Sequence, residues 1–297
     1  MEIRLSQAGS ARRRLKVALA IGGSDPGGGA GIQADLKTFA ACGVYGYSAL
    51  TAVIAQNSSR VNEVAPVDAR LLRSQLALLV EEYPPDAVKI GALATAANVR
   101  AVARAIAELK LPNPVIDPVM VSTSGVALLD KAGAAELISE LLPRAALVTP
   151  NLPEAEALGG MAIASAAAMR AAARAIRRLG PRAVLIKGGH PLRRADGRGN
   201  DRIVDLLFDG RRFVEFSGAR IGAGAHGTGC AFAAAITAFM ARGFDLEDAI
   251  RRARRFMNSA LRESFTLGGG RPLLDHFAGW PRQAQRSSSS RRPAARL

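Results

Sequence analysis

Short apolar runs alternate with longer amphipathic segments along most of the chain, from Lys16 to about Phe277. The short runs fit buried β-strands, and the longer segments repeat their apolar residues every three to four positions, as amphipathic helices do. Regular alternation of the two is typical of parallel strands joined by crossover helices. The pattern therefore predicts an α/β fold with an open, mostly parallel central sheet and helices on both of its faces.

The individual elements follow from the same pattern and from residues that cap helices. Strands are predicted over residues 17–21, 47–54, 87–90, 115–117, 147–148, 184–187, 203–208 and 212–216. Helices are predicted over residues 32–41, 69–82, 96–109, 131–142, 153–158, 166–178, 227–242 and 246–264. Ser165 and Asp245 are expected N-cap residues, and Asp248 stands three positions after Asp245, as in a capping box.

The two ends of the chain differ from this alternating region. The formal net charge is +15, and nine of these charges lie in residues 1–16 and 281–297. The C-terminal stretch combines serines and arginines without apolar periodicity, which is typical of a solvated extension. We therefore expect a basic N-terminal tail over 1–15, one domain over 16–278 and a basic tail over 279–297. Weak, nonspecific attraction to polyanions is the expected consequence, without a specific nucleic-acid site.

Cysteine usage and hydropathy constrain the class of protein. Cys42 and Cys230 lie far apart and lack the spacing of a zinc site or of a disulfide framework. The basic and apolar residues near the N-terminus imitate a signal peptide, but Gly22-Gly23-Ser24-Asp25-Pro26 cuts the apolar run short. No apolar stretch is long enough to span a bilayer. We expect a cytoplasmic protein that has no membrane partner.

The most informative segment is the run of small residues Ala223-Gly224-Ala225-His226-Gly227-Thr228-Gly229-Cys230, which opens directly into an apolar helix. A helix start of this kind presents unpaired backbone N–H groups and the positive end of the helix dipole, which together suit a phosphate. The same dipole favours a thiolate, so Cys230 could serve as a base or nucleophile near neutral pH. The alternative is a packing role for the glycines and a small buried apolar role for Cys230.

Residues that follow the strands are candidate ligand-binding residues, because ligands of open α/β sheets bind at the carboxyl ends of strands. Residues 22–35 are rich in glycine but match neither a Walker loop nor a Gly-x-Gly-x-x-Gly motif. This loop could wrap a small planar substrate, with Asp35 accepting a hydrogen bond, or it could be only a tight turn. Gln56 offers an amide donor and acceptor that suit the edge of a heterocycle.

A second group of strand-end residues suits a nucleotide and a hard cation. Asp117 follows one strand and Glu154 begins the helix after the next, so the two carboxylates could share a magnesium site. Glu154 could also be a first-turn acid that matches the helix dipole. Lys187 ends a further strand, where it could meet nucleotide phosphates or simply face solvent.

In this order the segments resemble the ribokinase-like superfamily, and within it the hydroxymethylpyrimidine/phosphomethylpyrimidine kinases of thiamine biosynthesis. The resemblance covers residues 16–278 approximately and rests on six blocks: Gly27-Gly28-Gly29-Ala30-Gly31-Ile32-Gln33-Ala34-Asp35-Leu36-Lys37-Thr38, Thr51-Ala52-Val53-Ile54-Ala55-Gln56-Asn57, Asp117-Pro118-Val119-Met120, Thr149-Pro150-Asn151-Leu152-Pro153-Glu154-Ala155, Lys187-Gly188-Gly189-His190 and His226-Gly227-Thr228-Gly229-Cys230. It implies a three-layer α/β/α sandwich, use of ATP and Mg²⁺, and a homodimer.

The resemblance also implies roles for individual residues. The pyrimidine would be held by Asp35 and Gln56 near Gly23, with Ala92 and Val119 in the same pocket. MgATP would lie against Asn151, Glu154, Lys187 and His226, with Asp117 and Glu154 facing the metal. Cys230 would accept the proton of the hydroxymethyl group, while the amides of Gly227, Thr228, Gly229 and Cys230 stabilise charge on the transferred phosphoryl group. The same site would then convert the monophosphate to the diphosphate.

Three segments depart from the family pattern. Ala92 stands where the family usually has a methionine, residues 222–225 replace polar residues ahead of His226, and residues 268–277 keep only a rough likeness. A pyridoxal or pyridoxine kinase is therefore an alternative, because both substrates are flat nitrogen heterocycles with a hydroxymethyl arm. A noncatalytic protein that binds a ligand or polyanion through its basic tails is the alternative from another class.

Overall fold

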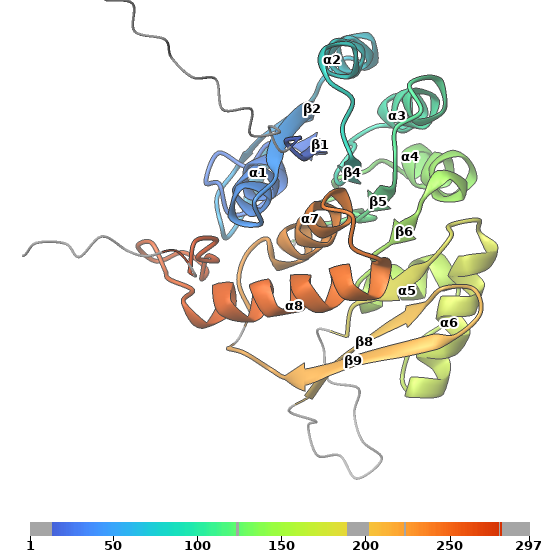
Figure 1. The fold of residues 1–297 in the computed structure, drawn as a ribbon, viewed down its shortest axis with the longest axis vertical. Helices are drawn as coiled ribbons and strands as arrows, with labels where there is room; N and C mark the ends of the chain where they lie inside the picture. Colours follow the sequence, from blue (N-terminus) through green and yellow to red (C-terminus); the bar gives the residue numbers. More distant parts are fainter. Residues whose placement is uncertain (1–13, 123–124, 189–201, 223, 279, 281–297) are drawn as a thin grey trace, which may run out of the picture.

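A nine-stranded sheet forms the middle layer of the protein, with helices covering both faces (Figure 1). The structure is a computed structural model that describes residues 14–122, 125–188, 202–222, 224–278 and 280. The strand order is β3-β2-β1-β4-β5-β6-β7-β8-β9. Strands β2, β1, β4, β5, β6 and β7 pair in parallel, whereas β3, β8 and β9 join the edges antiparallel. The predicted α/β class and the mostly parallel sheet are confirmed.

The strands are short in the middle of the sheet and longer toward its edges. Their bounds are β1 Val17–Gly23, β2 Tyr45–Gln56, β3 Val61–Pro66, β4 Ala87–Ile90, β5 Pro114–Ile116, β6 Leu147–Val148, β7 Val184–Ile186, β8 Arg202–Phe208 and β9 Phe213–Ala219. All residues of β1, β4, β5, β6 and β7 are buried, because helices cover both faces of these strands.

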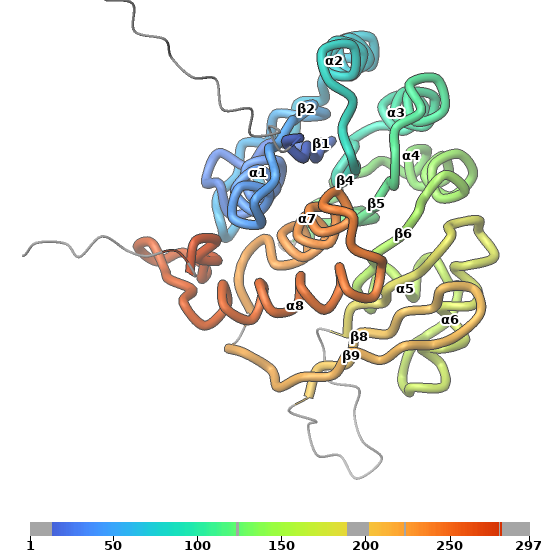
Figure 2. Tube along the Cα trace, viewed as in Figure 1, coloured from blue at the N-terminus to red at the C-terminus, as the bar shows by residue number. Residues whose placement is uncertain are grey.

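The helices form two layers, each closing its own apolar core against the sheet. One layer holds α1 (Gly31–Ala41), α7 (Thr228–Ala241) and α8 (Leu246–Arg262). The other holds α2 (Ala69–Glu82), α3 (Ala96–Glu108), α4 (Lys131–Glu136), α5 (Leu152–Gly159) and α6 (Ala166–Arg178). Helices α1 and α7, remote in sequence, lie side by side (Figure 2). The beginning of α7 therefore comes close to the loop that precedes α1.

Most predicted elements agree with the structure to within a few residues, with two exceptions. Strand β3 is absent from the prediction because it is an exposed edge strand with little apolar alternation, and it ends at Pro66. The predicted helix over 131–142 breaks into α4, a π-helical turn over Leu137–Leu141 and a short 3₁₀ turn over Leu142–Arg144. The leucines at positions 137, 141 and 142 are buried in this stretch, and Pro143, which lacks an N–H group, lies in the 3₁₀ turn.

Side-chain caps fix the starts of several helices. The predicted caps are confirmed: Ser165 Oγ accepts a hydrogen bond from the Ala168 amide, and Asp245 Oδ1 accepts one from the Asp248 amide. Asp68 and Thr95 cap α2 and α3 in the same way. These short-range bonds satisfy amides that the helix leaves unpaired.

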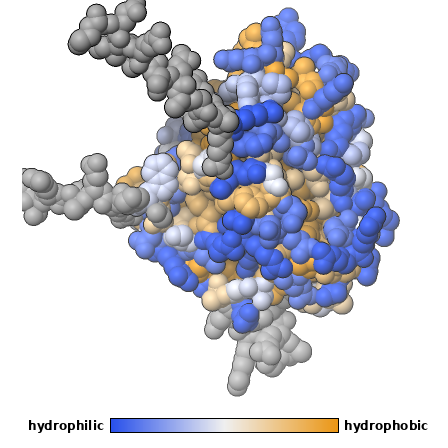
Figure 3. Space-filling model, in the orientation of Figure 1, coloured by the Kyte–Doolittle hydropathy of each residue, from blue (hydrophilic) through white to orange (hydrophobic). Residues whose placement is uncertain are grey.

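The surface of the described part is largely hydrophilic on the face that carries α8, with smaller apolar areas between the polar side chains (Figure 3). None of the helices within the described ranges is both long and apolar enough to cross a membrane. The predicted tails fall almost entirely outside the described residues; Arg14, at the start of these, donates a hydrogen bond to the Tyr83 hydroxyl.

Asn98 of α3 links strand β2 to the loop that follows β4. Its buried side-chain amide donates to the carbonyls of Thr51 and Leu93, at 3.1 Å each. We expect Asn98→Ala to lower the free energy of unfolding by about 1–3 kcal/mol, because two buried hydrogen bonds are lost and a small void is left. Urea denaturation measures this effect. The exposed Arg104→Ala on the same helix is the control, and an equal loss in both variants would contradict the role of Asn98.

Candidate active site

A cavity of about 450 Å³ runs along the carboxyl edge of the sheet, where the sequence places the strand-end residues. One end, called here the glycine-loop half, is lined by residues that include Gly23, Ile54, Gln56, Lys89, Ala92 and Val119. The other end, the α8 half, is lined by residues that include Asn151, Glu154, Lys187, Ile221, Arg254 and Leu261. The first turn of α7 lies between these halves, beside Gly29 of the glycine loop and Lys187 of the α8 half.

The start of α7 has no side-chain cap and leaves its first backbone amides without one. Gly227 is the N-cap residue, with a left-handed φ of 77°, and no side chain caps the helix. A Cβ atom at Gly227 would lie 1.8 Å from the carbonyl oxygen of Gly29, so only glycine fits this contact. The exposed helix start and its dipole together favour a bound phosphate, as the sequence predicts.

Cys230 lies in the first turn of α7 and lines the cavity. Burial raises the pKa of its thiol to about 11, and the charges of Asp117 and Asp35 add to this effect against the opposing charge of Lys89. A helix dipole contributes about 0.3–1 kcal/mol, less than one pKa unit, so it cannot offset this burial. The expectation that the dipole keeps Cys230 a thiolate near neutral pH is therefore wrong for the ligand-free protein.

A largely buried ion pair between Lys187 and Asp117 lines the cavity. Lys187 Nζ lies 2.6 Å from Asp117 Oδ1, and the Thr149 hydroxyl donates to the same oxygen at 3.3 Å. Burial lowers the pKa of Lys187, but Asp117 and Glu154 raise it above its usual value, so the lysine stays cationic. Asp117 accepts both hydrogen bonds through Oδ1. Its other oxygen, Oδ2, faces the α7 N-terminus.

Glu154 combines a structural contact with a position in the cavity wall. It forms a reciprocal capping box with Asn151, in which each backbone amide donates to the other residue's side chain, at 2.8 and 2.9 Å. Burial raises the pKa of Glu154 to about 7, with Asp117 adding to the rise and Lys187 opposing it. Asp117 and Glu154 supply the hard oxygen ligands that Mg²⁺ accepts alongside substrate phosphates, so their chemistry fits this cation.

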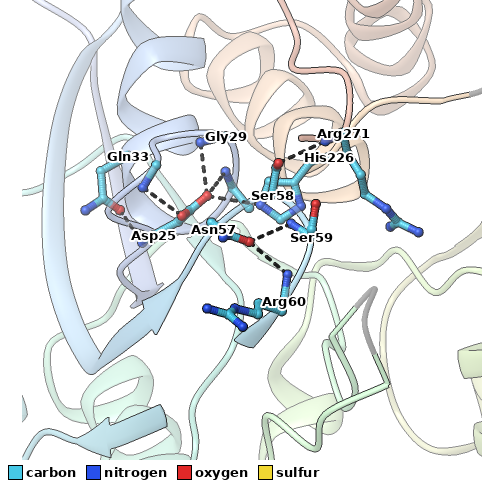
Figure 4. A network of polar contacts seen from close by, with 11 residues as sticks. Asp25, Gly29, Gln33, Asn57, Ser58, Ser59, Arg60, His226 and Arg271 are labelled. Carbon is cyan, nitrogen blue, oxygen red and sulfur yellow. Dashed lines mark hydrogen bonds and ion pairs between the residues drawn. The ribbon is translucent and has the colours of Figure 1, made fainter. Parts of the chain in front are cut away.

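A second polar network fastens the glycine loop to the loop before α7 (Figure 4). Asp25 accepts hydrogen bonds from the backbone amides of Gly27, Gly29 and Ala30, and its Oδ2 lies 3.1 Å from His226 Nε2. Asp25 is 1% exposed, and these hydrogen bonds lower its pKa even though burial opposes them. His226, expected at the nucleotide, therefore lines the cavity while it holds the glycine loop in place.

A second buried ion pair joins Lys89 of β4 to Asp35 of α1. Lys89 Nζ lies 2.8 Å from Asp35 Oδ2, and the two side chains are 1% and 0% exposed. Burial raises the pKa of Asp35 to about 6, against the opposing effect of Lys89, so the carboxyl is ionised at neutral pH. Burial lowers the pKa of Lys89, but the charges of Asp35, Cys230 and Asp117 together raise it above its ordinary value.

The structure brings nearly all the predicted site residues into one cavity wall, and their roles stay predictions. The wall contains Gly23, Gln56, Ala92, Asp117, Val119, Asn151, Glu154, Lys187, His226, Gly227, Thr228, Gly229 and Cys230. Asp35 is the exception, because its carboxylate is fully buried behind Lys89 instead of facing the cavity. His190 and Ala223, which belong to two of the sequence motifs, lie outside the described residues.

Sequence reasoning missed two charged pairs that each place at least one residue in the cavity wall. One is Lys89 with Asp35; a lysine inside the otherwise apolar strand Ala87–Ile90 is the signal that could have identified it. The other is Arg254 of α8, which donates to Asp205 of β8, while Asp205 Oδ1 accepts a hydrogen bond from the Gly188 amide. The arginines of α8 share an amphipathic pattern, and only the fold distinguishes Arg254 from its exposed neighbours.

Comparisons with known proteins agree on one family. A family model described as phosphomethylpyrimidine kinase matches residues 25–275. The chain is 43% identical over 262 residues to a hydroxymethylpyrimidine/phosphomethylpyrimidine kinase of Bacillus subtilis, covering 88% of this chain and 94% of that protein. It is 44% identical over 260 residues to the thiamine biosynthesis bifunctional protein ThiED of Geobacter sulfurreducens, covering 87% of this chain but only about half, 52%, of that longer protein.

Solved structures show the same fold. A pyridoxal kinase from Staphylococcus aureus, in complex with AMP-PCP and pyridoxal, superimposes with a TM-score of 0.80 and 34% sequence identity. The match covers 90% of this chain and 95% of that chain.

The raised pKa of Cys230 predicts how its thiol reacts in the ligand-free protein. In a Cys42→Ala variant, which leaves one cysteine, alkylation by iodoacetamide should quicken about tenfold per pH unit between pH 7 and 9, because only the thiolate reacts. Mass spectrometry follows the adduct, and a Cys230→Ala variant is the control for the buried Cys42. A rate that levels off below pH 9 would contradict the raised pKa.

Proposed function

Because the chain belongs to the phosphomethylpyrimidine kinase family, we propose that it phosphorylates 4-amino-5-hydroxymethyl-2-methylpyrimidine with ATP. It then phosphorylates the monophosphate to the diphosphate, in thiamine biosynthesis. The observation that carries the proposal is the α7 N-terminus, with Cys230 in its first turn, set between the two halves of one cavity. A phosphoryl group in transit needs such donors where its charge develops.

The two halves of the cavity suit the two substrates. The glycine-loop half offers the amide of Gln56 for hydrogen bonds to a heterocycle and apolar contacts from Ile54, Val119 and Leu128 for its ring faces. The α8 half offers Ile221, Leu261 and Asn258 around the nucleotide and Lys187 near its phosphates. With this placement, the hydroxymethyl group and the terminal phosphate meet at the start of α7.

The chemistry of the first transfer assigns a role to each central group. The alcohol oxygen attacks the terminal phosphorus of ATP, the bond from that phosphorus to its bridging oxygen breaks, and the alcohol proton passes to the thiolate form of Cys230, which is the minor form at neutral pH. The amides of Gly227 to Cys230 and the ammonium of Lys187 stabilise the charge on the transferred group. Asp117 and Glu154 would hold Mg²⁺, which neutralises phosphate charge when bound. Asp35 does not line the cavity and therefore has no direct role in this transfer.

A pyridoxal kinase is the second candidate. The 34% identity to the pyridoxal kinase of Staphylococcus aureus favours it, as does Ala92, whose small side chain leaves more room in the glycine-loop half. Pyridoxal is also a flat nitrogen heterocycle with a hydroxymethyl arm, so the same phosphoryl-transfer groups would serve it. The two functions therefore differ in the acceptor and not in the mechanism.

The remaining features rest on the family resemblance. We propose that residues 16–278 act as one catalytic domain between basic tails, in a cytoplasmic homodimer that needs neither nucleic acid nor membrane. Exposed apolar side chains, among them Tyr45, Val53 and Leu71, offer area that a second copy could cover. Sedimentation velocity tests the dimer: a single species of monomer mass at micromolar concentration would contradict it.

The decisive experiment presents the hydroxymethylpyrimidine and pyridoxal side by side with MgATP and identifies the products by mass. We expect pyrimidine monophosphate first and pyrimidine diphosphate later, because one cavity serves both acceptors. A Cys230→Ala variant, which lacks the proton acceptor, should lower kcat for the alcohol about 10²–10⁴-fold. Phosphate on pyridoxal alone would establish the second candidate, and transfer to neither acceptor would contradict both.

A further inference from the structure

Lys89 is a buried cation in the glycine-loop half that the first transfer does not require. It lies on β4 beside Ala20 of β1 and Val115 of β5, in a row of side chains that is otherwise apolar. Its ammonium is held at 2.8 Å by Asp35 from α1, and its side chain is 1% exposed. Lys89 nevertheless lines the cavity.

Stability does not explain this pair well. Burying two charges removes their hydration, and the attraction between them barely compensates for this cost. Apolar residues of similar volume often replace a buried ion pair without loss of stability. The pair is also incompletely satisfied, because Asp35 Oδ1 is buried and has no hydrogen-bond partner. An ammonium carries three N–H donors, and the contact with Asp35 uses one of them. The remaining donors can serve a ligand in the cavity.

The cavity contains two such lysines, one in each half. Lys187 is held by Asp117 at 2.6 Å in the α8 half, and Lys89 is held by Asp35 in the glycine-loop half. The α7 N-terminus lies between them: Lys89 is close enough to Cys230 for their charges to interact, and Lys187 Nζ would lie 3.2 Å from a Cβ at Gly229. The phosphates of ATP, the phosphoryl donor, explain why a cation is needed at Lys187. A neutral alcohol in the opposite half gives Lys89 no anion to bind.

We propose that Lys89 binds the phosphate group of the pyrimidine monophosphate when that molecule is the acceptor of the second transfer. This inference rests on the proposed function and extends it by separating the groups that the two transfers use. The acceptor phosphate carries a charge of about −1.5 to −2 at neutral pH, and a cation fixed in its half of the cavity offsets this charge. Without Lys89, the repulsion between the acceptor phosphate and the terminal phosphate of ATP would be less compensated.

The two transfers also differ in their protons. In the first, an O–H bond breaks and Cys230 receives the proton. In the second, an ionised oxygen of the acceptor phosphate forms the new bond to the terminal phosphorus of ATP, the bond from that phosphorus to its bridging oxygen breaks, and ADP leaves with the electron pair. No proton needs a protein acceptor in this step. The first transfer therefore depends more on Cys230, and the second depends more on Lys89.

The test measures kcat/KM for each acceptor separately, at saturating MgATP, in the full chain. The main variant is Asp35→Asn with Lys89→Met, which removes both charges together and avoids an unpaired buried carboxylate. A second variant, Asp35→Asn with Lys89→Gln, keeps a polar contact in case the first does not fold. We expect kcat/KM for the monophosphate to fall about 10- to 100-fold more than kcat/KM for the alcohol, the value of a charge-assisted hydrogen bond.

Two controls separate this role from general damage. Lys187→Met removes the matched lysine of the α8 half, and it should lower both transfers by the same factor because ATP is common to them. Cys230→Ala should lower kcat/KM for the alcohol more than kcat/KM for the monophosphate. The Lys89 variants should do the opposite. Calorimetric titration of the monophosphate without nucleotide supplies a reading that does not depend on turnover.

The possible outcomes distinguish the role of Lys89 from the proposed function. Equal losses for both acceptors in the Lys89 variants, or unchanged affinity for the monophosphate, would overturn the role of Lys89 and leave the proposed function intact. A wild-type protein that phosphorylates the alcohol but neither binds nor phosphorylates the monophosphate would overturn the second reaction and the role of Lys89 together. A loss confined to the monophosphate, in both rate and affinity, supports the inference.

Discussion

Charge compensation beneath the start of α7 is the constraint on which the cavity depends. Lys89 is buried and Lys187 is largely buried, and each lies within hydrogen-bond distance of a carboxylate, at 2.8 Å from Asp35 and 2.6 Å from Asp117. Burial lowers the pKa of each lysine, and the nearby carboxylates more than reverse this effect. Both ammonium groups are therefore fixed cations whose charges are balanced by carboxylates, and their N–H groups and the amides of the helix start are donors placed along one cavity.

Close backbone contacts hold this site together. The glycine loop can approach α7 only because Gly31 has a left-handed φ of 58° and because no side chain at Gly227 separates the two segments. Asp25 then binds three amides of the loop and faces His226 across the contact. One carboxylate thus fastens the loop to the helix start, so the geometry of the phosphate site follows from main-chain packing.

The sequence predicts the fold well because most strands are continuous apolar runs and most helices have clear caps. It fails at β3, whose exposed edge position requires no apolar alternation, and at Leu137–Leu141, where the need to bury leucines overrides regular helix geometry. The site residues could be placed together because parallel strands end at one edge. Lys89 inside an apolar strand signals that a buried partner is needed, but the sequence does not identify Asp35 as that partner, because this depends on how α1 crosses β4. The high pKa of Cys230 depends on burial that no local pattern records.

A cavity that accepts both an alcohol and its phosphate must hold the same ring at two depths, because the attacking oxygen has to reach the same phosphorus each time. The wall around the ring fits this requirement. Ile54, Leu128, Val119 and Ala92 belong to one apolar cluster, and apolar contacts are not directional, so a ring can shift along them at little cost. Hydrogen bonds are directional, so a shift of the ring would weaken its hydrogen bonds to the Gln56 amide unless another interaction offset this loss. A fixed cation that binds only the longer acceptor supplies such an interaction, which explains how one rigid site can serve two successive acceptors without rebuilding its wall.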